Sequence, residues 1–304
     1  MKALFTFSGQ GAQFVGMGGD LAAASSAARE IFDRADNALG YALSDVIANG
    51  PIEKLTDSRY CQCAIYTVSC AALAAFNERF SVTPVACAGL SLGEYAALYA
   101  GKAFSFETGI KLLARRGELM DIACKANPGT MASVIGAEVG VIEKICAEIG
   151  LDVANYNSPA QIVISGTHPQ VEQAIEALKN AGARKVVPLN VAGAFHSRLM
   201  KDAGIALTED LARAEIVTPE IPVFHNFTAK TAGTPDQIRQ ALAAQVSGSV
   251  RWESCVRNAV ADFGADAMIE FGPGNVLTGL AKRTLPDLKL VNINSAASLD
   301  AAEL

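Results

Sequence analysis

The chain has 304 residues, of which 51% are hydrophobic and 18% are charged, so it is long enough to bury a large core. A formal net charge of −6, with no block of Lys or Arg, argues against a nucleic-acid partner. No apolar run approaches the roughly 20 residues of a membrane-spanning helix, and no signal-peptide pattern opens the chain. We therefore expect no membrane association and a cytoplasmic location. The seven cysteines form no C-x-x-C pair and have no neighbouring His, so no metal site is predicted.

Three apolar runs, each followed by a Gly-containing turn and a helical pattern, predict an α/β fold with a parallel sheet. They span Ala3 to Phe7, Val85 to Ala88 and Ala267 to Phe271. The first run leads into Gly9-Gln10-Gly11, which in a parallel sheet emerges at the same edge as the turn after the second run. A plain glycine turn is the alternative interpretation of this loop.

The second run leads into Gly89-Leu90-Ser91-Leu92-Gly93, which fits the G-x-S-x-G pattern of a serine nucleophile on a sharp strand-to-helix turn. Such a turn needs small residues beside the serine, and it sets Ser91 at a helix N-terminus, where developing negative charge is favoured. The N–H groups of Leu92 and Gln10 would then form a two-donor oxyanion hole. A Gly-rich turn with an incidental serine is the alternative.

The helix predicted over residues 107–125 carries an arginine on its apolar face. Its apolar arc consists of Leu112, Leu113, Leu119, Met120 and Ala123, and Arg116 falls inside that arc. Arg115 lies nearer Glu118 and can pair with it in solvent. A buried guanidinium needs a carboxylate partner, which is either a protein Asp or Glu or the carboxylate of a substrate.

Residues 131–189 show the order strand, helix, strand, strand, helix, strand, with predicted bounds 131–136, 138–149, 152–156, 161–166, 170–180 and 184–189. This order is the ferredoxin-like plan. We therefore expect a large α/β-hydrolase-like domain formed by residues 1–126 and 191–304, with a ferredoxin-like subdomain inserted at residues 127–190.

A serine nucleophile needs a base, most often histidine, and the chain has only three. His168 precedes Pro169 at a helix entrance, which favours a surface or capping position. His225 lies at a strand end, where a structural histidine is at least as probable. His196 lies where the chain returns from the insert to the larger domain, which makes it the best placed of the three. No Asp is positioned to complete a triad, so a carbonyl or amide group is expected to orient the imidazole.

Five segments occur in the order and spacing of one family from the first strand to about Lys282; they are Phe7-Ser8-Gly9-Gln10-Gly11-Ala12-Gln13, Gly89-Leu90-Ser91-Leu92-Gly93-Glu94-Tyr95, Arg115-Arg116-Gly117, Gly193-Ala194-Phe195-His196-Ser197 and Phe271-Gly272-Pro273-Gly274. Together they resemble malonyl-CoA:acyl carrier protein transacylases. The resemblance implies malonyl-CoA and acyl carrier protein as partners, and no cofactor, since the CoA thioester is the substrate.

The resemblance also implies a role for each matching residue. Ser91 is the expected nucleophile, His196 the base, and Arg116 the partner of the malonyl carboxylate. The backbone amides of Gln10 and Leu92 form the oxyanion hole, and the main-chain carbonyl of Gln245 holds His196. Met120 and Phe195 are also expected to contact the substrate, and Phe195 would crowd an α-methyl group. Asn155 is expected in the pantetheine channel, and packing explains it equally well.

Two positions depart from the commonest family pattern. Leu90 stands where His is usual, and Cys63 stands in an expected loop, Cys61-Gln62-Cys63, where proline is usual. Neither change removes a reacting group, so altered packing near the site is expected. The remaining alternatives are an acyltransferase that feeds a polyketide or polyunsaturated fatty acid synthase, a serine thioesterase or esterase, and a non-catalytic docking module for a carrier protein.

Overall fold

The computed structural model describes residues 1–304 and contains a larger sheet of six strands in the order β10-β9-β1-β2-β7-β8. Its strands are β1 (Ala3–Phe7), β2 (Ala86–Gly89), β7 (Val223–His225), β8 (Lys230–Thr231), β9 (Ala267–Phe271) and β10 (Lys289–Ile293). Every neighbouring pair is parallel except β7 and β8. The chain is therefore a mixed α/β protein with a parallel sheet core, as predicted.

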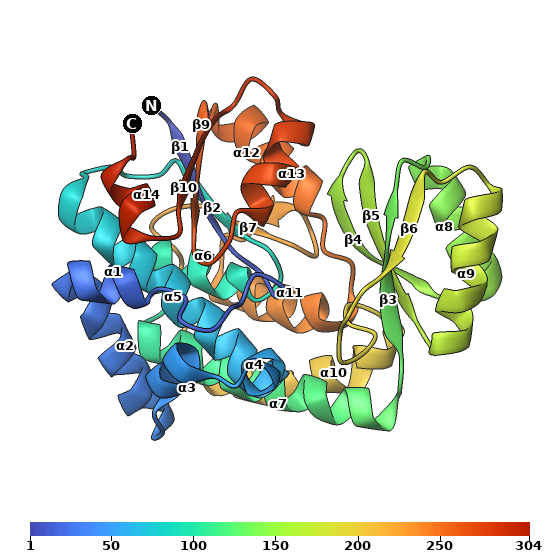
Figure 1. The fold of residues 1–304 in the computed structure, drawn as a ribbon, viewed down its shortest axis with the longest axis horizontal. Coiled ribbons are helices and arrows are strands. Elements are labelled where there is room, and N and C mark those ends of the chain that lie inside the picture. Colours follow the sequence, from blue (N-terminus) through green and yellow to red (C-terminus); the bar gives the residue numbers. More distant parts are fainter.

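Helices cover both faces of this sheet (Figure 1). Phe5 and Phe7 of β1 belong to the main core, together with residues of α5 (Ser58–Arg79), α6 (Gly93–Ala100) and α7 (Phe106–Ala126). Leu4 points the other way, into a second core with residues of α12 (Trp252–Phe263) and α13 (Val276–Thr284). Because successive strand side chains alternate between faces, a strand covered on both faces is apolar throughout.

The other helices of the larger unit surround these cores. They are α1 (Gly19–Ala24), α2 (Ser26–Leu39), α3 (Leu43–Asn49), α4 (Ile52–Thr56), α10 (Lys201–Arg213), α11 (Pro235–Ser247) and α14 (Ala296–Asp300), with a 3-10 turn, η1, at Arg198–Met200. No helix of the chain combines the length and the apolar character that crossing a bilayer requires.

The expected loop at Cys61-Gln62-Cys63 is wrong, because these residues lie inside helix α5. None of the three is a helix breaker, and all three are fully buried. The Cys63 Sγ lies 3.7 Å from the carbonyl oxygen of Ile110 on α7, and burial raises the pKa of Cys63 to about 12. Cys63 is therefore an inert core thiol.

The second sheet has four strands in the order β4-β5-β3-β6, all antiparallel. Its elements follow the predicted order: β3 (Thr130–Ile135), α8 (Val139–Ile149), β4 (Asp152–Ser158), β5 (Gln161–Gly166), α9 (His168–Asn180) and β6 (Lys185–Pro188). It has a hydrophobic core of its own, built from its strands and both helices. Figure 1 shows this unit beside the larger one, with α8 and α9 on its outer side.

Main-chain hydrogen bonds join β4 to the segment that follows α11. The Tyr156 N–H donates to the Val250 carbonyl at 2.9 Å, and the Val250 N–H donates to the Ala154 carbonyl at 2.8 Å. An ion pair between Arg198 and Asp152, 2.8 Å long, links η1 to the first residue of β4. These contacts fix the small unit against the larger one.

Candidate active site

Ser91 occupies the turn between β2 and α6, with a left-handed backbone conformation at φ 54°. A Cβ at Gly89 would lie 2.0 Å from the backbone of Gly93, and a Cβ at Gly93 would lie 2.3 Å from the carbonyl oxygen of Phe7. Both glycines are therefore required sterically, as the motif predicted. A non-glycine residue with positive φ is uncommon and costly, and such residues cluster at functional sites.

Asn226 braces this turn from the end of strand β7, which neighbours β2. Its Oδ1 accepts the Ser91 N–H at 2.6 Å, and its Nδ2 donates to the Gly89 carbonyl at 2.8 Å. Asn226 is not among the residues predicted from the sequence. The available signal was a polar side chain at the carboxyl end of a strand, the edge at which parallel sheets bind ligands.

His196 lies beside the serine, with its Nε2 2.8 Å from the Ser91 Oγ. Its Nδ1 lies 2.8 Å from the Gln245 carbonyl oxygen, so Nδ1 carries the proton and Nε2 is free to accept the hydroxyl proton of Ser91. The pKa of His196 is lowered to about 4, first by burial and then by the positive charge of Arg116. A neutral imidazole facing a serine hydroxyl has the geometry of a general base and its nucleophile.

The other two histidines lie elsewhere. His168 is exposed at the first position of α9, in agreement with the surface position expected for it. His225 is buried, and its Nδ1 lies 2.7 Å from Glu94 Oε1. Of the three histidines, the structure brings only His196 into contact with Ser91.

Arg116 is 1% exposed and contacts Ser91, because its Nη2 donates to Ser91 Oγ at 3.1 Å. The same Nη2 donates to Gln245 Oε1 at 3.0 Å, and Nη1 donates to Gln62 Oε1 at 2.6 Å. Its Nε has no hydrogen-bond partner, and burial lowers its pKa. No Asp or Glu forms an ion pair with Arg116, whereas Arg115 pairs with Glu118 as predicted.

The loop after β1 lies against the serine turn. A Cβ at Gly9 would lie 2.7 Å from the carbonyl oxygen of Leu90, so the two backbones are in close contact. Neither the Gln10 N–H nor the Leu92 N–H donates a hydrogen bond within the protein. Two free N–H groups beside a nucleophile are the elements of an oxyanion hole. The half-buried Leu90 side chain packs against the second core.

The other predicted substrate contacts lie on α7, next to His196 and on β4. The buried Met120 Sδ accepts a weak hydrogen bond from Gln62 Nε2 at 3.4 Å, so it shares a partner with Arg116. Phe195 precedes His196 and belongs to the main core. Asn155 lies on β4, and its side chain makes no hydrogen bond within the protein. No hydrogen bond joins the Asn155 side chain to Ser91, His196 or Arg116, and its backbone pairs with Val250.

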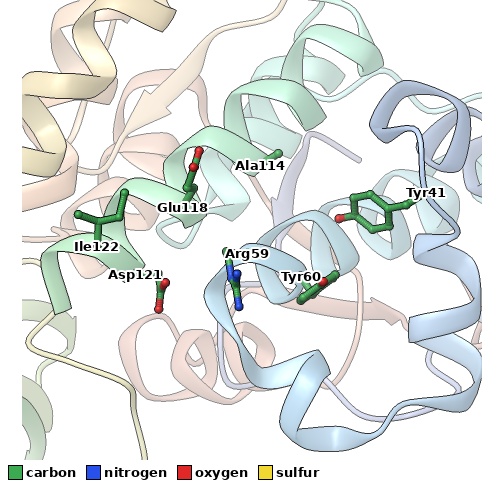
Figure 2. Close-up of a pocket in the computed structure, with 7 residues that line it drawn as sticks. All are labelled: Tyr41, Arg59, Tyr60, Ala114, Glu118, Asp121 and Ile122. Carbon is green, nitrogen blue, oxygen red and sulfur yellow. The ribbon is translucent and has the colours of Figure 1, made fainter. Parts of the chain in front are cut away.

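A pocket of about 430 Å³ lies on the outer side of α5 and α7 (Figure 2). Tyr41 and Tyr60 line one end, and Glu118, Asp121 and Ile122 line the α7 side. Arg116 points to the opposite, buried side of α7, and no residue of the serine group lines this pocket. It is therefore separate from the candidate active site.

A serine hydroxyl in contact with a neutral histidine and with a buried arginine is a combination suited to acyl transfer to and from a serine. The chain belongs to the acyl transferase domain family, whose model matches residues 4–301. It is 38% identical to the malonyl CoA-acyl carrier protein transacylase of Bacillus subtilis (strain 168), over 99% of this chain and 96% of that protein.

Two solved structures share the whole fold. An acyl carrier protein S-malonyltransferase from Vibrio cholerae superposes with a TM-score of 0.96 at 39% identity, and the match covers 100% of both chains. A malonyl-transacylase solved in complex with its type II polyketide acyl-carrier protein has a TM-score of 0.96 at 36% identity, over 99% of each chain.

Proposed function

We propose that this protein transfers the malonyl group of malonyl-CoA to the phosphopantetheine thiol of acyl carrier protein, through an ester on Ser91, and so supplies fatty acid biosynthesis. One observation carries the proposal: the buried Arg116 guanidinium contacts the Ser91 Oγ and has no acidic partner in the protein. Of the two partners considered for it, a substrate carboxylate therefore fits better. The names of the relatives point to the same reaction.

In the first step the Ser91 Oγ attacks the thioester carbonyl carbon while its proton passes to His196 Nε2. The N–H groups of Gln10 and Leu92 stabilise the oxyanion. The carbon–sulfur bond breaks, and the sulfur of CoA takes the proton from His196. The products are malonyl-Ser91 and free CoA thiol.

The second step reverses the first with a different thiol. The phosphopantetheine sulfur attacks the Ser91 ester while its proton passes to His196. The ester carbon–oxygen bond breaks, and His196 returns the proton to Ser91 Oγ. His196 has the right tautomer in both steps because its Nδ1–H is held by the Gln245 carbonyl.

Arg116 selects the acyl group, because its planar fork can bind a carboxylate bidentately. Met120 and Phe195 are proposed to line the acyl site, Phe195 from the position next to the base. Asn155, on the strand that joins the two units, is proposed to contact the pantetheine arm rather than the acyl group.

We also propose the finer domain description. Residues 1–126 and 191–304 form an α/β-hydrolase-like catalytic domain, and residues 127–190 form a ferredoxin-like subdomain. The order of the six elements and the separate core of the small unit support this division. The cytoplasmic location stays a prediction.

Intact-mass measurement tests the function directly. The purified protein is mixed with malonyl-CoA or with acetyl-CoA, beside the variants Ser91→Ala and Arg116→Ala. We expect a malonyl adduct that requires Ser91, a preference for malonyl over acetyl, and loss of that preference without Arg116. Turnover of simple esters, with no adduct and no transfer to carrier protein, would contradict the transferase and support a thioesterase or esterase activity instead.

A further inference from the structure

A buried carboxylate lies beneath the nucleophile. Glu94, in the first turn of α6, is fully buried and forms no ion pair with any Lys or Arg. Its Oε1 accepts from His225 Nδ1 at 2.7 Å, and its Oε2 accepts from the Asn226 N–H at 2.8 Å and from Gln245 Nε2 at 2.7 Å. Buried charges are tolerated when they are well hydrogen-bonded, and three N–H donors satisfy this carboxylate.

These contacts determine which way the Gln245 amide faces. Its nitrogen faces only acceptors: the Glu94 carboxylate, the Ser91 carbonyl at 3.0 Å and Asn226 Oδ1 at 3.4 Å. Its oxygen faces a donor, Arg116 Nη2. A flipped amide would set its NH2 against the guanidinium and its oxygen against the carboxylate. Because amide orientation follows the hydrogen-bond network, Glu94 locks the oxygen toward Arg116.

The amide also separates two opposite buried charges. The Arg116 cation and the Glu94 anion do not touch, and the Gln245 side chain bridges them. Glu94 therefore stabilises the buried cation through the low-dielectric interior without binding the guanidinium itself. A direct ion pair would have competed with a substrate carboxylate for the guanidinium N–H groups.

We propose that Glu94, completed by His225, is a positioning residue that aims Arg116 at the acyl carboxylate through the Gln245 side chain. This inference rests on the proposed function, since it gives Arg116 a carboxylate to bind. Gln245 then has two separate roles: its main-chain carbonyl orients His196, and its side-chain amide orients Arg116.

The test compares the rates of Ser91 acylation by malonyl-CoA and by acetyl-CoA in Glu94→Ala, Glu94→Gln and Gln245→Leu. Glu94→Ala is expected to reduce the malonyl-to-acetyl preference by about tenfold or more, the scale of losing a charge-assisted contact, with a much smaller change in the acetyl rate. Glu94→Gln should retain more of the preference than Glu94→Ala, because its amide oxygen can accept from Gln245 while its NH2 donates to the other tautomer of His225, and only the negative charge is lost.

Gln245→Leu keeps the carbonyl that holds His196 and should lose the preference in the same way. Adding Glu94→Ala to it should then change the preference no further. The matched control is Glu270→Gln, another fully buried carboxylate, which accepts from Leu277 and Thr278 on α13 and makes no hydrogen bond to Gln245 or Arg116. This control is expected to lower stability and leave the preference unchanged.

Equal losses of malonyl and acetyl acylation in folded Glu94→Ala would reduce Glu94 to a structural residue and overturn the inference. If Glu94→Ala does not fold, Gln245→Leu decides, and an unchanged preference in that variant overturns it too. Failure of the proposed function looks different, because the wild-type protein would then form no malonyl adduct.

Discussion

Arg116 Nη2 and Ser91 Oγ are hydrogen-bonded at 3.1 Å, so a buried cation reaches the atom that must become nucleophilic. The same guanidinium stands close enough to His196 to help lower its pKa. Arg116 therefore contacts the proposed nucleophile and lowers the pKa of the proposed base before any substrate arrives.

Arg116→Lys should reduce kcat/KM for malonyl-CoA by about 100-fold, because an ammonium cannot span Gln62 and Gln245 while binding a carboxylate at two points. Steady-state transfer to carrier protein measures the effect. The control is Arg115→Lys, one residue away on the solvent side, which should stay within about twofold of wild type because exposed ion pairs contribute little. Equal effects of the two substitutions would contradict a role for Arg116 in binding the acyl group.

Histidine NMR should show one imidazole that titrates near pH 4, assigned to His196 by its loss in His196→Gln. The signal is resolvable because the chain has three histidines. Burial and Arg116 both disfavour the imidazolium, so Arg116→Gln should raise this pKa. A His196 pKa near 6.5 in the wild type would contradict the account of a base kept neutral.

The same shift predicts that stability depends on pH. The folded-state pKa of His196 lies below its ordinary value of 6.5, so the unfolded state takes up the proton first as the pH falls. The folded state should therefore lose up to about 3 kcal/mol between pH 6.5 and pH 4 from this group alone. Urea unfolding of wild type and His196→Gln across this range measures the difference, and parallel pH dependences in the two proteins would exclude it.

Asn226→Ala should lower the free energy of unfolding by about 1–3 kcal/mol, because it leaves the Ser91 N–H and the Gly89 carbonyl without partners in a buried turn. Acylation should slow as well, since the Ser91 backbone is no longer held at positive φ. Asn258→Ala is the control, because it removes one hydrogen bond, to the Ala229 carbonyl, that does not involve the serine turn. It should leave acylation intact.

Gly93→Ala should destabilise the fold by about 3 kcal/mol or more, because the new methyl would meet the Phe7 and Ser8 carbonyl oxygens, which belong to the backbone and cannot rotate away. Gly279→Ala, on α13 with open space around it, should instead raise stability by about 0.5–1 kcal/mol. Denaturant midpoints compare the two. An unchanged free energy of unfolding in Gly93→Ala would mean that the loop after β1 can move away from the serine turn.

Much of this architecture is predictable because local patterns encode it. The strands at Ala3 and Ala267, the serine turn and the six elements of the insert each carry their own signal of apolar period and turn residues. Arg116 was detectable because a single charge interrupts an apolar helical face. The loop expected at Cys61-Gln62-Cys63 was wrong because it relied on the proline that is usual in the family at this place. The residues of this chain have no proline there and continue a helix.

The residues that hold the site residues in place were harder to predict, because they are distant from them in the sequence. Asn226 reaches Ser91 across 135 positions, and Glu94 meets Gln245 across 151. In the sequence each of these residues resembles an ordinary polar residue of a turn or a helix. Only the pairing of β7 with β2 and the packing of α11 against the serine turn reveal what they contact.

Gln245 serves the site with two parts that differ in how they respond to mutation. Every amino acid has a main-chain carbonyl, so no replacement at position 245 deletes the group that anchors His196. The side-chain amide that holds Arg116 disappears with almost any replacement. If Arg116 selects the acyl group as proposed, replacements at position 245 would over evolutionary time change which acyl groups are accepted and leave the main-chain anchor of His196 in place.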